Sequence, residues 1–77
     1  MNKQRRKQLD EMSYRLDYIA EELSLIMQDE EEAFNNIPDS LSETERYARA
    51  ETAVEALQEA ADALVETIDR IREAIDA

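Results

Sequence analysis

The chain has 77 residues and contains no cysteine, histidine, tryptophan or glycine. The absence of cysteine and histidine excludes disulfides, thiolate or imidazole metal sites, and catalysis by these side chains. Without glycine there is also no glycine-rich loop of the kind that cradles phosphates. We therefore expect no metal and no cofactor.

Long apolar runs are also missing. No stretch approaches the roughly 20 apolar residues that span a bilayer. The basic start, Lys3 to Lys7, is followed by Leu9, Asp10 and Glu11 and not by the apolar core of a signal peptide. These features predict a cytoplasmic protein with no membrane contact.

Positive charge is scarce outside the first residues. The net charge is −11, from 20 acidic and 9 basic residues. Residues 1–8 hold four bases and no acid, so the remaining chain sets 20 acids against five bases and carries −15. Such a body repels nucleic acid and membrane phosphates and attracts basic protein surfaces. The same charge is also typical of a solvated helix surface, so it does not by itself identify a partner.

The single proline divides the chain into two segments. Pro38 cannot donate a backbone hydrogen bond and moves Ile37 out of the α region, so a first helix should end near Asn35 or Asn36. Ser40 is a good N-cap, and Glu43 three positions later completes a capping box. We expect a first helix over about residues 3–36, a turn over 36–40 and a second helix over about 41–76, all in one domain of residues 1–77.

Both segments have a heptad pattern of apolar residues. In the first, Leu9, Leu16 and Leu23 occupy position a, and Met12, Ile19, Ile26 and Ala33 occupy d, with Glu30 as the one interruption. Apolar residues at e (Ala20, Met27, Phe34) widen this stripe enough for a helix bundle. In the second segment, apolar residues follow one another at alternating steps of three and four positions without a break: Tyr47, Ala50, Val54, Leu57, Ala61, Leu64, Ile68, Ile71 and Ile75.

Two helices of similar length joined by a short turn predict an all-α antiparallel helical hairpin, similar to a coiled coil. With Asn36 facing Leu41, Glu30 falls near Tyr47, and Asn2 and Arg5 face Ile75 and Ile71. Those isoleucines then lack apolar partners in their own chain. A lone hairpin of this size is marginally stable, so we expect a homodimer, most simply a four-helix bundle. The residues expected in the core or dimer interface are Leu16, Ile19, Leu23, Ile26, Phe34, Val54, Leu57, Leu64, Ile68, Ile71 and Ile75.

Candidate binding residues lie in two groups. A second stripe, Tyr14, Tyr18 and Leu25, lies on nearly the opposite side of the first helix from its seam. The acidic run before the turn forms the other group, although it lacks the glycine and the alternating spacing of a calcium loop. The partner-binding candidates are Asp29, Glu31, Glu32, Asp39, Tyr14, Tyr18 and Leu25.

The apolar residues at the turn have two interpretations. Phe34, Ile37 and Leu41 either close the end of the core as a structural staple or form an exposed recognition tip, and we favour the staple. The basic N-terminus is expected to lie beside Glu73 and Asp76 and to pair with them.

The turn and its flanks resemble a known pattern. The string Glu31-Glu32-Ala33-Phe34-Asn35-Asn36-Ile37-Pro38-Asp39-Ser40-Leu41, followed by Ser42-Glu43-Thr44-Glu45-Arg46, resembles a motif in small acidic proteins of phages, prophages and conjugative elements. The basic opening and the helix around Ala53 to Ala60 are similar too, so the resemblance spans nearly the whole chain. The resemblance implies a protein that a phage or other mobile element encodes and that acts in a bacterial host cell. It implies no particular activity. Asn35 replaces a frequent acid, and the glycine often found near Arg46 and Tyr47 is missing, so the turn is expected to differ in detail.

Three functional classes follow. The first is a non-enzymatic module whose acidic helical surface binds a host or phage protein. The alternative is a nucleic-acid mimic that occupies the DNA site of a host or defence protein. An enzyme is the least favoured class, because paired carboxylates carry no signal without a pocket to hold a substrate.

Overall fold

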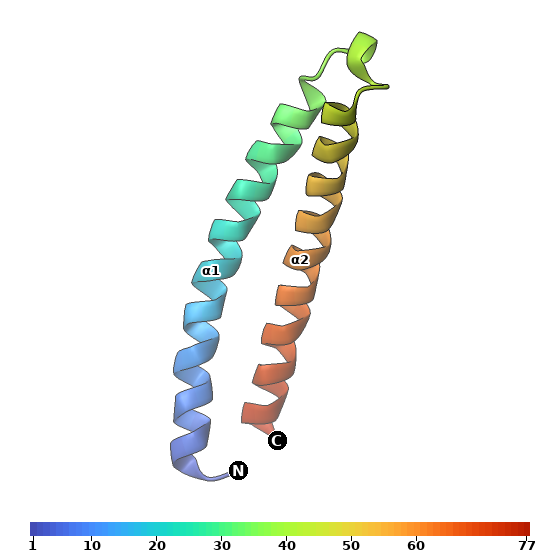
Figure 1. Cartoon of the computed structure of the whole chain (residues 1–77). Helices are drawn as coiled ribbons and strands as arrows, with labels where there is room; N and C mark the ends of the chain where they lie inside the picture. Colours follow the sequence, from blue (N-terminus) through green and yellow to red (C-terminus); the bar gives the residue numbers. More distant parts are fainter.

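The protein is a helical hairpin in the computed structural model, which describes all 77 residues. Helix α1 spans Lys3–Asn35, a short 3-10 helix η1 spans Asp39–Leu41, and α2 spans Glu45–Asp76. The two long helices run antiparallel, with the turn at one end and both chain termini at the other (Figure 1). The molecule measures 59 × 15 × 13 Å. The predicted all-α hairpin is confirmed.

The first helix begins and ends where its sequence predicts. Asn2 is the N-cap, and its side-chain oxygen accepts a hydrogen bond of 2.8 Å from the backbone N–H of Arg5. At the other end the backbone N–H of Asn36 still bonds to the Glu32 carbonyl at 3.1 Å. Pro38 follows with extended backbone angles, φ −60° and ψ 144°, which are incompatible with a continuing helix.

The second helix begins four residues later than expected. Its N-cap is Thr44, whose hydroxyl accepts from the Tyr47 N–H at 3.2 Å and donates to the Leu41 carbonyl at 2.6 Å. The predicted capping box of Ser40 and Glu43 was therefore wrong. Ser40 lies inside η1, which is closed by the Leu41 N–H to Pro38 carbonyl bond at 2.9 Å.

The pairing of the helices explains the longer turn. Phe34 packs against Tyr47, with ring centroids 4.9 Å apart, and at the open end the Arg6 Nε donates to the Ile75 carbonyl at 3.0 Å. The expected pairing of Glu30 with Tyr47 was thus wrong by about one helical turn. Because Phe34 takes the place opposite Tyr47, the chain needs the extra residues of η1 to reach the start of α2.

The same shift changes the open end. Asn2 and Arg5 were expected to face Ile75 and Ile71, but Arg6 reaches Ile75, and Leu9 and Ile71 line one groove. Ile71 therefore has an apolar neighbour in its own chain, contrary to expectation.

Helix α2 presents its predicted seam to α1. Val54 and Ile68, both at position a, are only 7% and 5% exposed and form the whole fully buried apolar core. The d residues Leu57, Leu64 and Ile71 are half-buried beside them. The heptad assignment of this helix is confirmed.

Helix α1 is rotated about its axis relative to the prediction. Position e faces α2: Ser13 is fully buried, and Ala20, Met27 and Phe34 follow it at intervals of one heptad. The small side chains of Ser13 and Ala20 allow the helices to approach closely. The Ser13 hydroxyl donates to the Asp10 carbonyl at 2.8 Å, so its burial leaves no unsatisfied polar group.

This rotation exposes the predicted d positions of α1. Met12, Ile19 and Ile26 are 41%, 49% and 56% exposed. Ile19 and Ile26, expected in the core or the dimer interface, therefore do not belong to the core of the single chain. The a residues Leu16 and Leu23 remain half-buried at the edge of the contact.

Candidate interaction surfaces

The rotation of α1 gives the hairpin two chemically different broad faces. We define the apolar face by the a and d positions of α1 between residues 9 and 26 and the d and g positions of α2 between residues 50 and 74. None of these residues is charged, in a chain in which 38% of residues are charged. They are Leu9, Met12, Leu16, Ile19, Leu23 and Ile26 of α1, and Ala50, Ala53, Leu57, Ala60, Leu64, Thr67, Ile71 and Ala74 of α2.

Surface hollows show that both helices contribute to this face. One groove is lined by Leu9 of α1 and by six residues of α2, of which Glu66 and Arg70 are charged: Ala63, Glu66, Thr67, Arg70, Ile71 and Ala74. A second hollow continues along α1 past Leu9 and Met12 toward Arg5. The alanines keep the α2 side of the face low, so large side chains of another helix could pack there.

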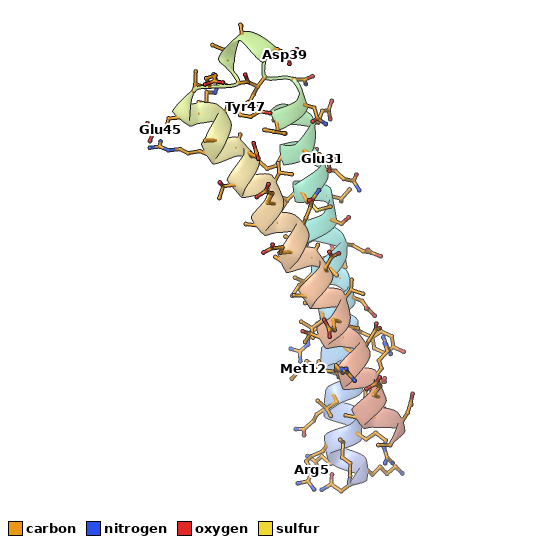
Figure 2. All side chains as sticks on the ribbon, turned by 90° about the vertical axis from the view of Figure 1, so that its right-hand side faces the viewer. Arg5, Met12, Glu31, Asp39, Glu45 and Tyr47 are labelled. Atoms are coloured by element: carbon orange, nitrogen blue, oxygen red, sulfur yellow. The ribbon has the colours of Figure 1, made fainter.

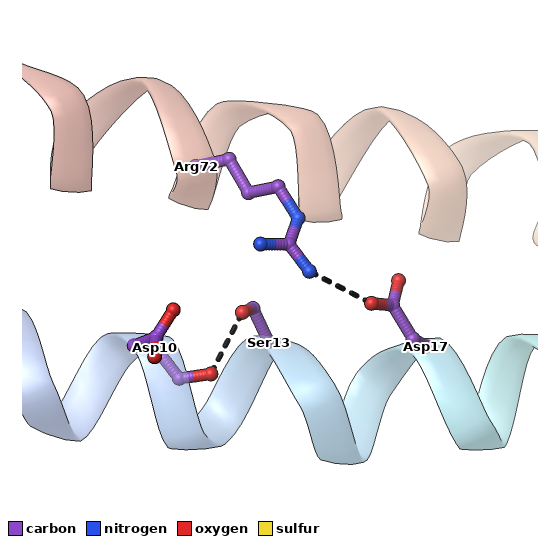
Figure 3. Close-up of polar contacts among 4 residues, drawn as sticks. All are labelled: Asp10, Ser13, Asp17 and Arg72. Carbon is purple, nitrogen blue, oxygen red and sulfur yellow. Dashed lines mark hydrogen bonds and ion pairs between the residues drawn. The ribbon is translucent and has the colours of Figure 1, made fainter.

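The opposite side, which we call the polar face, is held by an ion pair. Arg72 of α2 contacts the Asp17 carboxylate of α1 at 2.8 Å, next to the buried Ser13 (Figure 3). Its guanidinium also lies over the Tyr14 ring, 5.6 Å from the centroid. The Arg72 and Asp17 side chains are 40% and 48% exposed, so this pair adds only a few tenths of a kcal/mol to stability. The pair shows that position b of α1, where Asp17 lies, is on the polar side of the contact with α2.

The sequence analysis missed this cluster. Asp17 and Arg72 lie outside the apolar heptads, and in so acidic a chain many Asp–Arg pairs are conceivable. One sequence pattern could have pointed to this cluster: position b of α1 is polar in every heptad, with Asp10, Asp17, Ser24 and Glu31. The pattern predicts a contact with α2 only when it is known which edge of α1 faces that helix.

An acidic row runs along the outer edge of α2. It consists of the b and f positions from Glu55 onward, alternating in steps of four and three, and all of its members are exposed. Only Glu73 of this row has an ion-pair partner, Arg70 at 3.0 Å. Across the whole molecule, three carboxylates are paired out of 20 acidic residues. The row is Glu55, Glu59, Asp62, Glu66, Asp69, Glu73 and Asp76.

Only some of the acidic candidates near the turn lie together in one hollow. Glu31 and Glu32 line one shallow hollow together with Gln28, Asn35 and Asn36. Asp29 and Asp39 do not line it, and Asp39 lies in η1. No group of three or more carboxylates lies close enough together to hold a metal ion.

The second stripe of α1 is exposed, as expected. Tyr14, Tyr18 and Leu25 are 62%, 67% and 62% exposed. They do not share a pocket, and Tyr14 is partly covered by Arg72. This part of α1 offers separate apolar contacts on a polar surface.

The tip of the hairpin is closed by aromatic packing. Phe34 and Tyr47 are half-buried against one another, and Ile37 is half-buried beyond them. Figure 2 shows Tyr47 just below the turn, between the start of α2 and the end of α1. Leu41 is 39% exposed. Phe34 thus occupies the position expected of a staple, whereas Leu41 is the most accessible apolar residue of the turn.

The basic N-terminus does not form the expected ion pairs. Glu73 pairs with Arg70, and Asp76 has no ion-pair partner. Arg6 instead donates to the Ile75 carbonyl, one of the free carbonyls at the end of α2. Lys3, Arg5 and Lys7 are exposed and unpaired.

Neither long helix has an apolar stretch sufficient to cross a bilayer. Comparison of the chain with protein-family models, with curated proteins and with solved structures found no match.

Proposed function

We propose that this protein is a non-enzymatic interaction module that acts as a homodimer in the cytoplasm and binds a protein with a basic surface. The observation that carries this proposal is the exposed and almost entirely unpaired set of carboxylates, ordered along α2 in one continuous row. Charges placed this way attract a cationic surface over many ångströms and speed its encounter with the hairpin. The resemblance of the turn to proteins of phages and conjugative elements supports a partner from the host or the phage.

Three regions are available for this partner. The acidic row is a straight edge that suits a basic helix or groove. The turn end adds Asp29, Glu31, Glu32 and Asp39, and the back of α1 adds the exposed Tyr14, Tyr18 and Leu25. Aromatic side chains surrounded by charge are typical anchors of protein interfaces.

The alternative is a nucleic-acid mimic, and charge density argues against it for a single hairpin. A net charge of −11 over 59 Å is about one charge per 5 Å, whereas duplex DNA carries one per about 1.7 Å. The single chain is therefore about three times too weakly charged to imitate the duplex, and two chains side by side, with −22 over the same length, still fall short by a factor of about 1.6. We favour the protein-interaction module for this reason.

Affinity capture with charge-neutral variants tests the proposal. The unchanged protein, a row variant (Glu59→Gln, Asp62→Asn, Glu66→Gln, Asp69→Asn) and a turn variant (Glu31→Gln, Glu32→Gln) serve as baits in bacterial lysate, with mass spectrometry as the readout. We expect a basic partner that is released by salt, is lost with at least one variant and is not displaced by duplex DNA.

Two results would change the conclusion. Displacement of the partner by DNA would favour the mimic. Capture that is indifferent to salt and to both variants would reject the acidic surface as the binding site. Circular dichroism of each variant controls for folding, because removing like charges should not lower helicity.

A further inference from the structure

We infer that the apolar face is covered by a second copy of this chain that runs in the opposite direction, so that the two turns lie at opposite ends of a four-helix bundle. This arrangement rests on the homodimer of the proposed function and adds which face pairs and in which direction. Association is measured on the purified protein alone, so its failure is distinguishable from a failure to bind the partner.

The surface area of the hairpin indicates that something covers it. The chain exposes 6065 Å². A compact monomer of 8.9 kDa exposes about 4800 Å², so this hairpin has a surplus of roughly 1200 Å². A standard protein interface removes about 800 Å² from each partner. One standard dimer interface would therefore remove about two thirds of the surplus.

The spacing of the apolar face of α1 suits an antiparallel copy. Its stripe is bounded by Leu9 and Ile26, and its middle lies between Asp17 and Tyr18. When a second α1 is laid antiparallel about that middle, Leu9 meets Ile26 of the partner subunit, and Leu16 meets Ile19 of the partner subunit. Every large apolar residue of the stripe then has an apolar counterpart.

The same axis suits α2. Phe34 lies against Tyr47 and Arg6 against Ile75, so the middle of the α1 stripe lies opposite Ala63 in α2. An antiparallel α2 pair centred at this level sets Ala53 against Ala74 of the partner subunit and Ala60 against Thr67 of the partner subunit. Leu57 then falls within about one residue of Ile71 of the partner subunit. The small residues let the two helices approach closely, so the large ones can interlock between them.

Charge at the ends of α1 selects this direction over the parallel one. The first turn of α1 contains no acid and its last turn no base, so its charges oppose the helix dipole at both ends. Figure 2 shows Arg5 and Glu31 at opposite ends of the helix. In the antiparallel pair Arg5 lies next to Glu30 of the partner subunit, twice by symmetry. A copy with its turn at the same end would instead place two basic N-termini together.

Two measurements on the purified full chain test the inference. Sedimentation equilibrium should give twice the chain mass, and a monomer mass at tens of micromolar would overturn the proposal. The chain has no native cysteine, so Gln4→Cys can be spin-labelled at a single site. With 1.5 Å per residue, the two labels should lie about 40 Å apart, whereas a same-end dimer would give less than about 25 Å and would overturn the antiparallel arrangement.

Charge reversal tests the alignment itself. Arg5→Glu and Glu30→Arg should each raise the dissociation constant of the dimer about tenfold, and the double variant should restore it to within about twofold. Lys7→Glu is the matched control, because it changes the net charge as Arg5→Glu does but lies away from the apolar face; it should change the constant much less. A double variant that is as weak as the two single variants combined would reject the pairing of Arg5 with Glu30.

Discussion

The two broad faces of the hairpin are built from the same two helices, but they differ in what they leave exposed. The apolar face has 14 uncharged positions and no polar contact between the helices. The polar face has the Arg72–Asp17 pair, the Tyr14 contact and the nearby acidic row. Only Val54 and Ile68 are fully buried apolar residues between them. The difference fits the proposed dimer, in which the second copy covers the apolar face and the polar face stays in water for a partner.

A pair of adjacent residues tests this comparison most strongly. Ile26 and Leu25 are 56% and 62% exposed and neighbours in sequence, but Ile26 lies on the apolar face and Leu25 on the back of α1. Ile26→Asp should dissociate the dimer and lower the free energy of unfolding by about 3 kcal/mol, because a charge would be placed in an apolar interface. Leu25→Asp should cost less than about 0.5 kcal/mol. Thermal melts and sedimentation of both variants measure this; equal effects would mean that the faces do not differ.

Phe34 lies between the helices and belongs to neither face. Phe34→Ala should destabilise the hairpin by about 2 kcal/mol, less than a fully buried phenylalanine would, since it is half-buried against Tyr47. Urea unfolding measures the loss, and Leu41→Ala at the exposed turn is the control with a much smaller effect. If Phe34→Ala kept its full stability and lost its protein partner, the tip would be a recognition site and not a staple.

Repulsion from the net negative charge should lower the stability of the hairpin and also weaken its association with a second copy. Mild acidification or added salt should raise the melting temperature by a few degrees, because lowering or screening the net charge of −11 relieves repulsion along a thin hairpin and between two copies. Calorimetry from pH 7 to pH 5, at low and high salt, follows this effect. A steady fall in melting temperature over that range would show that specific carboxylate contacts matter more than overall repulsion.

The smallest effect is expected on the polar face. Arg72→Ala should reduce stability by about 0.5 kcal/mol, since its ion pair is half-exposed and its contact with Tyr14 is at the surface. Arg72→Lys should recover part of this loss. A double-mutant cycle with Asp17→Asn measures the pair directly, and a coupling above about 2 kcal/mol would give the polar face a structural role that we do not expect.

The sequence predicted the hairpin, the end of α1 at Pro38 and the seam of α2, because each depends on local signals or on a single unbroken pattern. It did not predict the rotation of α1. Apolar residues occupy positions d, a and e in that helix, so several edges could face α2 equally well. The choice depends on the close approach at Ser13 and on the distant pair of Asp17 with Arg72, which no local pattern encodes.

The prediction of where α2 begins failed for a related reason. Ser40 and Thr44 are both good N-caps by composition, and only the packing of Phe34 on Tyr47 decides between them. Among the candidate binding residues, exposure of the second stripe was predictable from its position opposite the seam. The Arg72 cluster and the open apolar face required the relative rotation of both helices.

The contact of Phe34 with Tyr47 has a consequence for the order in which the hairpin forms. These residues are separated by little more than the turn, whereas Arg6 and Ile75 at the open end are 69 positions apart. Loop-closure entropy grows with the length of chain between two contacts, so the aromatic pair closes first and the remaining contacts follow from it toward the termini. The contacts between the two helices therefore form in order from the turn toward the termini. The contacts at the basic end form last and open first.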